Sequence, residues 1–254
     1  MPASIKLQRE YGDDVAVVFV ESQGTSAPDT DRFVMKQRWL GTQAMWTNES
    51  PFNSGSGGLP NYVLLGADGK VLQKGRSLSS KDHDLLDAEI KRAKGAPEGT
   101  DKAFNGAWKD FNKGKYGKAI VTVQKLSVKK PEMADAAAEV MATFEARVQA
   151  QLDRVDWLMK NGYPGDAKDR LDELASGLSG ADELLGKARE LDGVLASDEM
   201  KRELEADKKL GRALESLFED GRDEKLFDRV TKLSEEFAGT KVAERAQRFA
   251  SMRP

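Results

Sequence analysis

The clearest structural signal in the chain lies at residues 58–71, Gly58-Leu59-Pro60-Asn61-Tyr62-Val63-Leu64-Leu65-Gly66-Ala67-Asp68-Gly69-Lys70-Val71. Two runs of strand length, 61–65 and 71–74, flank an Asp-Gly pair at 68–69. A tight turn between antiparallel strands needs a positive φ, which glycine adopts at little cost. The stretch therefore predicts a β-hairpin.

Segments on either side of this hairpin predict further α/β structure. Upstream, periodicity and turn residues predict a helix, a strand, a helix and a strand, in that order, at 2–11, 15–20, 30–40 and 44–47. The run Val15–Val20 is nearly continuously apolar, which is typical of a strand covered on both faces. Downstream, Ser79 or Ser80 starts a helix that continues to Lys94, where the breaker Gly95–Gly99 ends it. We therefore expect one domain over residues 1–95.

Beyond Thr100 the sequence predicts helices alone. Three helical hairpins and a last helix are expected at 103–112 with 116–126, 148–161 with 166–174, 208–220 with 224–237, and 241–252. Short turns make neighbouring helices antiparallel, and one pair cannot bury its apolar face alone. Residues 101–254 are thus expected to form a second, all-α domain of stacked hairpins. Four apolar residues are expected to pack between its helices, namely Trp108, Phe111, Tyr116 and Ile120.

Composition excludes several kinds of site. The 40 Lys and Arg nearly balance the 43 Asp and Glu, and the net charge of -3 makes no electrostatic case for a nucleic-acid partner or an anionic membrane. No apolar run approaches the roughly 20 residues that span a bilayer, so no membrane insertion is expected. The chain has no cysteine and a single histidine, His83. We therefore expect no catalytic residue, no cofactor and no metal. Localisation and oligomeric state are not predicted.

The order of elements over residues 2–94 resembles the thioredoxin fold after its active-site strand. Residues 58–71 are similar to the cis-proline loop and hairpin of thioredoxin-related thiol-disulfide oxidoreductases and peroxiredoxin-related proteins. The resemblance implies an α/β thioredoxin-like domain that is N-terminally incomplete. It also implies a peptide-binding site at Leu59 and cis Pro60, flanked by Trp46 and Phe52. The alternative is an ordinary trans bond, since only about 5–6% of X-Pro bonds are cis, but the hairpin in register favours cis.

The redox motif of that family has no counterpart in this chain. Pro2 matches a proline partway along the family's first helix, so Cys-x-x-Cys and the preceding central strand would lie before Met1. Without that strand, Val15–Val20 and Asn61–Leu65 each lose a hydrogen-bonding neighbour, which costs about 1–3 kcal/mol per buried unpaired group. We expect the two strands to pair directly, a strand to be borrowed from another chain, or the domain to be unstable.

The helical region resembles tetratricopeptide-type repeats in two stretches, Trp108-Lys109-Asp110-Phe111-Asn112-Lys113-Gly114-Lys115-Tyr116-Gly117-Lys118-Ala119 and Glu236-Phe237-Ala238-Gly239-Thr240-Lys241-Val242-Ala243-Glu244-Arg245-Ala246. The repeats do not follow a strict 34-residue period. This resemblance implies that the C-terminal domain docks a protein partner in its groove.

Other residues have simpler interpretations. The acidic pair Asp153 and Asp156 lies among basic residues on an amphipathic helix, as does the acidic run 169–173, and both predict a solvated face rather than a metal or acid-base site. The tryptophans at 39, 46, 108 and 157 could serve as ligand platforms, but packing in the core is the favoured prediction, although Trp46 could flank Pro60.

Two functional hypotheses follow. In the first, the chain is a redox-silent, thioredoxin-like interaction protein that binds a protein or extended peptide and has a helical repeat docking domain. In the second, it is an N-terminally truncated thiol-disulfide oxidoreductase whose Cys-x-x-Cys lies upstream of Met1, where an export signal could also lie. The printed chain cannot perform thiol chemistry in either case, because no side chain can form the mixed disulfide.

Overall fold

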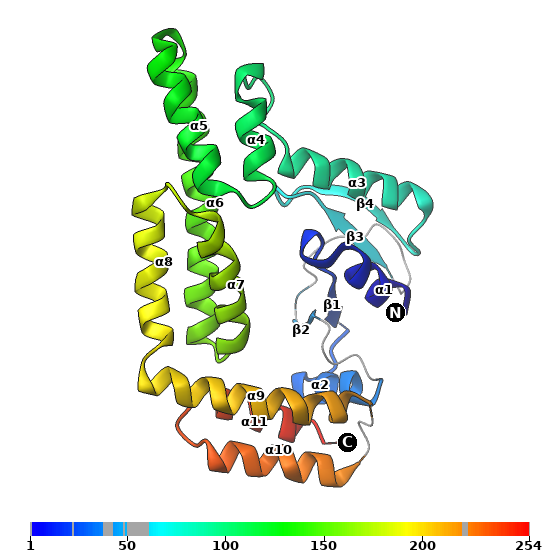
Figure 1. The fold of residues 1–254 in the computed structure, drawn as a ribbon. Coiled ribbons are helices and arrows are strands. Elements are labelled where there is room, and N and C mark those ends of the chain that lie inside the picture. Colours follow the sequence, from blue (N-terminus) through cyan, green and yellow to red (C-terminus); the bar gives the residue numbers. More distant parts are fainter. Residues whose placement is uncertain are drawn as a thin grey trace. The chain divides into compact units, whose positions relative to one another are not determined.

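The computed structural model describes residues 2–21, 23–37, 43–47, 49, 61–219 and 223–253. The chain divides into two compact units, Met1–Pro97 and Glu98–Arg253. All described strands belong to the first unit, and the regular elements described in the second are helices (Figure 1).

The described part of the first unit contains three α-helices and four short strands. In chain order they are α1 (Pro2–Tyr11), β1 (Val18–Glu21), α2 (Ala27–Lys36), β2 (Gln43–Trp46), β3 (Tyr62–Leu65), β4 (Val71–Gly75) and α3 (Ser80–Lys94). Strand β1 pairs in parallel with β2, and β3 pairs antiparallel with β4. The described strands thus make two separate two-stranded sheets.

The predicted hairpin is confirmed. Its turn is closed by hydrogen bonds from the Gly66 amide to the Lys70 carbonyl, 2.8 Å, and from the Gly69 amide to the Gly66 carbonyl, 2.9 Å. Gly69 has φ +78°, the conformation that the Asp-Gly pair predicts. The hairpin is also bonded to α3, since Tyr62 Oη donates to Asp82 Oδ1 at 2.6 Å.

The fold class predicted for residues 1–95 is wrong for the described residues, which lack the continuous sheet of a thioredoxin-like domain. Strand β1 does not pair with β3, contrary to one expectation for these strands. It is also not covered on both faces, because the side chains of Val18 and Val20 are 47% and 40% exposed. A sheet of two strands offers too little surface to bury both faces of either strand.

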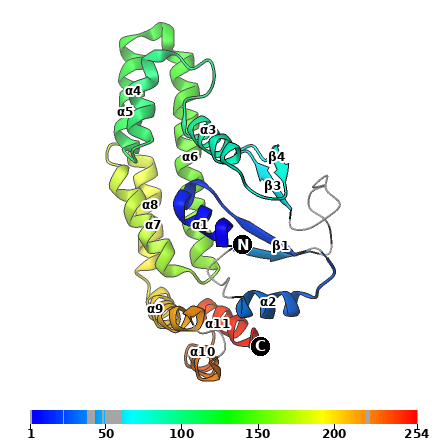
Figure 2. The same ribbon diagram turned by 90° about the vertical axis from the view of Figure 1, so that its right-hand side faces the viewer.

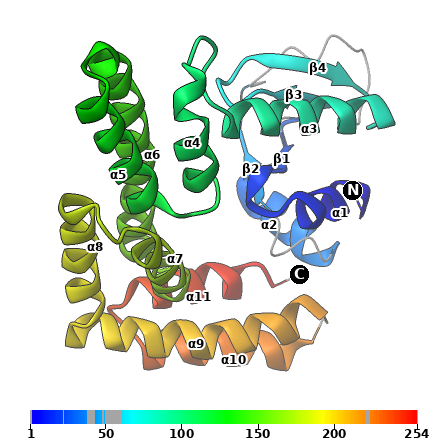
Figure 3. The ribbon, with the colours of Figure 1, turned by 45° about the horizontal axis from the view of Figure 1, so that its top comes forward.

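The second unit is built from eight α-helices in its described part. They are α4 (Asn105–Phe111), α5 (Tyr116–Lys129), α6 (Ala134–Lys160), α7 (Pro164–Gly177), α8 (Asp182–Leu195), α9 (Asp198–Glu219), α10 (Glu224–Glu236) and α11 (Lys241–Ser251). Helix α6 is the longest, with α4 and α5 beside one part and α7 and α8 beside another (Figure 2). Helices α9, α10 and α11 lie side by side (Figure 3).

Aromatic side chains form the core where α4, α5 and α6 meet. The rings of Phe111 and Phe144 stack with centroids 4.2 Å apart, and Trp108 contacts Phe144 edge-on at 4.7 Å. Trp108, Phe111 and Ile120 are all at most 5% exposed. Tyr116 is half-buried against Phe111, with centroids 4.9 Å apart. The predicted packing of these four residues between helices is therefore confirmed.

Candidate binding surface along helix α6

One face of α6 carries side chains that do not belong to the apolar stripe of the helix. Arg147, Ala150, Arg154 and Trp157 are spaced by three, four and three residues, which places them on one side of the helix. Arg147 is half-buried, Ala150 and Arg154 are exposed, and Trp157 is 45% exposed. We call these four residues the α6 face. The buried side of the same helix is apolar, and includes Phe144, Val148, Leu152, Val155 and Met159.

At one end of this face, Arg147 lies over a buried indole. Its guanidinium carbon is 5.0 Å from the centroid of the Trp108 ring. Burial alone lowers the pKa of Arg147. No charged neighbour contributes to this shift, and within the described ranges no carboxylate pairs with Arg147. The indole N–H of Trp108 is buried and has no acceptor there. The hydrogen-bond donors that this end of the surface offers are therefore those of the Arg147 guanidinium.

At the other end, Trp157 contacts both a guanidinium and a phenol. The guanidinium carbon of Arg154 lies 4.4 Å from the Trp157 ring centroid. The Tyr163 ring is nearly parallel to the indole, at an interplanar angle of 15° and a centroid distance of 6.2 Å. Cation–π and stacked contacts of this kind restrict the rotamers of all three side chains. A large aromatic side chain is thus held in place while almost half of it is exposed.

Tyr163 is held in turn by a polar junction between the α6–α7 turn, α9 and α11. The guanidinium carbon of Arg245 lies 3.7 Å from the Tyr163 ring centroid. Arg245 Nη1 donates to Asp207 Oδ1 at 2.8 Å and also to the Gly162 carbonyl. Asp207 Oδ2 accepts from the Gly165 amide at 3.1 Å. The turn that carries Tyr163 is thereby bonded to α9 and to α11.

A second carboxyl lies near this junction. The Asp166 residue as a whole is exposed, but partial burial of its carboxyl and the negative charge of Asp207 raise its pKa, while Arg245 acts in the opposite direction. Two carboxylates thus share one guanidinium. This favours holding Arg245 in position rather than offering it to a ligand, so we treat Arg245 as a residue that positions Tyr163.

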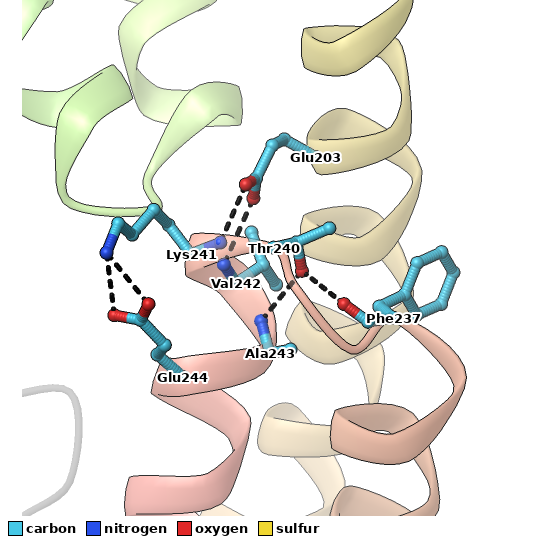
Figure 4. A network of polar contacts seen from close by, with 7 residues as sticks. All are labelled: Glu203, Phe237, Thr240, Lys241, Val242, Ala243 and Glu244. Carbon is cyan, nitrogen blue, oxygen red and sulfur yellow. Dashed lines mark hydrogen bonds and ion pairs between the residues drawn. The ribbon is translucent and has the colours of Figure 1, made fainter.

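The start of α11 is anchored to α9 by a buried carboxylate (Figure 4). Glu203 is 7% exposed and accepts from the backbone amides of Lys241, at 2.6 Å, and Val242, at 3.0 Å. Thr240 caps the same helix, because its hydroxyl oxygen accepts from the Ala243 amide at 3.0 Å. These bonds satisfy amides that the first turn of a helix leaves without partners. They fix the helix that carries Arg245.

The helical hairpin next to the α6 face is strongly basic. Residues 102–130, which span α4 and α5, contain eight lysines and a single carboxylate, Asp110. Lys118 pairs with this carboxylate at 2.9 Å and is the first cause of its lowered pKa. Residues 131–253 contain 20 Lys and Arg against 28 Asp and Glu. Although the net charge of the whole chain is nearly neutral, residues 102–130 therefore form a basic region.

Most of the predicted peptide-binding residues lie outside the described part of the chain. Leu59, Pro60 and Phe52 lie outside the described residues. The backbone of Trp46 ends β2, where it pairs with Glu21, and its side chain is also outside the described part. A peptide-binding site at these four residues stays a prediction.

Trp157 was not predicted as a binding residue, and its predicted place in the core is wrong. Its position lies on the arginine-bearing face of α6 rather than on the apolar stripe. The sequence does contain the signal, since 147, 150, 154 and 157 recur at helical spacing apart from the apolar positions. Of the other tryptophans, Trp108 is buried as predicted, and Trp39 lies outside the described residues.

The polar cluster of the first unit is structural. Asp82 Oδ2 accepts from the Ser79 amide and hydroxyl at 2.7 and 2.6 Å, while Oδ1 accepts from Tyr62. Burial acts to raise the pKa of Asp82, but hydrogen bonds from Ser79 and Tyr62 outweigh it and lower that pKa. Burial and the bond to Asp82 raise the pKa of Tyr62 to about 12. Neither group can exchange a proton readily near neutral pH, so we assign the cluster to capping α3.

The acidic residues of the helical unit also have ordinary roles. Asp156 pairs with Lys160 at 2.6 Å and Asp172 with Lys168 at 2.8 Å, both four residues apart on solvated helix faces, as predicted. Over the described ranges, no group of three His, Asp or Glu side chains could hold a metal ion. None of the helices described is both long and apolar enough to cross a membrane.

Comparison with protein-family models, with curated proteins and with solved structures finds no match to this chain. The resemblances to thioredoxin-related proteins and to tetratricopeptide-type repeats therefore stay predictions. Functional inference has to start from the geometry of the α6 face.

Proposed function

We propose that this chain is a protein-interaction module whose helical unit binds a protein partner at the α6 face. The observation that carries the proposal is Trp157, which is 45% exposed although Arg154 and Tyr163 hold it in place. Tryptophan and arginine are the residues most enriched at the energetic centres of protein interfaces.

The rigidity of this arrangement supports binding. Ordering a rotamer-rich side chain at an interface costs about 0.5–1.5 kcal/mol. Trp157 avoids much of that cost, because Tyr163 beside it is itself held by Arg245. A side chain that is both exposed and ordered before binding can use its apolar area for affinity.

Catalysis has less support in this chain. It contains no cysteine for a mixed disulfide. The buried carboxylates Asp82 and Glu203 already accept hydrogen bonds that cap helices α3 and α11. The described residues thus offer a surface for recognition rather than a nucleophile with a base.

Affinity capture with the full chain tests this proposal. Tagged wild-type protein, Trp157→Ala and a control, Val194→Ala, are incubated with extracts of the organism that encodes the chain. Val194 is the matched control because it is 48% exposed on a different helix, α8. We expect wild type and control to retain the same protein, and Trp157→Ala to bind it at least about tenfold more weakly, as for a hot-spot residue.

The recovered protein is then purified, and its affinity for each variant is measured by calorimetry. Circular dichroism melting verifies that Trp157→Ala is folded. Equal affinity of the partner for wild type and Trp157→Ala would show that the α6 face is not the binding surface.

A further inference from the structure

We infer that the partner presents an acidic, extended segment to the α6 face, with its carboxylates bound by Arg147 and Arg154. This inference rests on the proposed function, because it specifies the partner at the same surface. It makes a separate claim about chemistry, which can fail while the proposed function stands.

In the part of the chain that the structure describes, neither Arg147 nor Arg154 pairs with a carboxylate. The guanidinium groups contact the rings of Trp108 and Trp157 instead. By contrast, Lys160 of α6 and Lys168 of α7 are each paired with an aspartate. A half-buried cation without a partner is unfavourable, and a bound carboxylate would offset that cost.

The spacing of the arginines selects an extended ligand. Seven residues separate them on α6, which corresponds to about 10.5 Å along a helix axis. Three residues of an extended chain span about 10 Å, and one turn of polyproline II spans about 9 Å. Carboxylates three residues apart in an extended partner therefore match the separation of the two arginines along the helix. Each guanidinium can bind a carboxylate through two parallel N–H···O bonds.

The helical hairpin beside the α6 face adds positive charge near the two arginines. The hairpin over 102–130 has eight lysines, and it packs beside α6 through Trp108 and Phe111. Ala150 lies between the two arginines on the α6 face and is small, so a backbone can approach the helix there. Trp157 adds an exposed apolar surface at the end of the face.

A short acidic peptide fits these charges better than a nucleic acid. Charges act over only about 8 Å at physiological salt. Residues 131–253 have eight more carboxylates than cations, so a long polyanion would meet net negative charge beyond the basic region. The Trp157 ring also already contacts Arg154 and Tyr163, whereas nucleic-acid bases need ring faces on which to stack.

Peptide display on the full chain tests the inference. Random 12-residue peptides are selected on wild type, and the selected sequences are synthesised with a fluorescein label for anisotropy titration. We expect sequences rich in Asp and Glu, with acidic residues three apart. The double variant Arg147→Gln/Arg154→Gln should bind them at least about a hundredfold more weakly, or tenfold per arginine, as expected for charged hydrogen bonds.

The matched control is Arg189→Gln/Arg229→Gln, which removes two exposed arginines from α8 and α10 and should leave the affinity unchanged. Circular dichroism melting of both double variants verifies their folding. Acidic peptides that bind the α6 double variant as tightly as wild type would overturn the inference. Tighter binding of a labelled U12 oligonucleotide, lost in that variant, would overturn it in favour of RNA.

The two proposals fail differently. Selected peptides that are neutral or basic, yet depend on Trp157, would overturn the acidic partner and support the proposed function. Peptides that bind both Trp157→Ala and the α6 double variant as tightly as wild type would overturn the inference alone. The proposed function fails only if affinity capture also shows no dependence on Trp157.

Discussion

Trp108 and Trp157 differ in burial because each occupies a different kind of helix face. Trp108 is 3% exposed in the core between α4 and α6, whereas Trp157 is 45% exposed on the arginine-bearing face of α6. Residue type alone predicts the core for both, because indole has a large apolar surface. The helical period of α6 places Trp157 away from the apolar stripe of that helix, and this period can be read from the sequence once the helix is known to begin at Ala134 rather than near Val148.

Glycines in the helical unit provide a residue-scale prediction. A Cβ on Gly117 would lie 2.0 Å from the Ser179 carbonyl oxygen, whereas a Cβ on Gly211, inside α9, would meet nothing within 4 Å. Gly117→Ala should therefore destabilise the unit by about 1–3 kcal/mol through backbone displacement. Gly211→Ala should stabilise it by roughly 0.5–1 kcal/mol, because alanine favours the helix.

Urea unfolding of the full chain, followed by circular dichroism at 222 nm, measures both changes. A Gly117→Ala protein as stable as wild type would show that the α7–α8 turn does not pack closely on α5.

At the element scale, local signals were reliable and non-local pairing was not. The hairpin over 62–75 and helix α3 follow from Asp68-Gly69 and Ser79, whose effects act within a few residues. The pairing of β1 with β2, and the absence of pairing with β3 among the described strands, depends on segments far apart in the sequence. Helix α8 was not predicted, since Gly186 and Gly193 weaken its helical signal.

The anchoring of α11 provides an element-scale prediction. Glu203→Ala removes the acceptor of two backbone amides at the start of that helix, so the unit should lose about 2–4 kcal/mol of stability. Glu203→Gln keeps a side-chain carbonyl and should lose less. The control is Glu205→Ala on the same helix, whose side chain is 62% exposed and pairs with Lys209. It should change stability by less than about 0.5 kcal/mol.

The free energy of unfolding of the three variants is compared by urea titration. Equal losses for Glu203→Ala and Glu205→Ala would contradict the anchoring role of Glu203.

At the scale of the whole molecule, net charge is a poor guide to the partner. The balance of 40 cations and 43 carboxylates makes no electrostatic case for a nucleic-acid partner or an anionic membrane, yet residues 102–130 carry eight lysines and one carboxylate. A count over shorter windows would have found this region before the structure. The contacts of Arg147 with Trp108 and of Trp157 with Tyr163 could not be predicted, because they join α4 to α6 and α6 to the following turn through tertiary packing.

Site-specific photo-crosslinking tests the central claim, binding of a protein at the α6 face, most directly. Ala150 lies between the two arginines and is replaced by the photo-reactive p-benzoylphenylalanine in the full chain, with Val194 replaced in a control. After irradiation in the organism that encodes the chain, we predict a discrete adduct with one protein from position 150, lost with Arg147→Gln/Arg154→Gln and absent from position 194. An adduct that forms equally from both positions would contradict binding at the α6 face, and one that persists in the double variant would contradict the role of the two arginines.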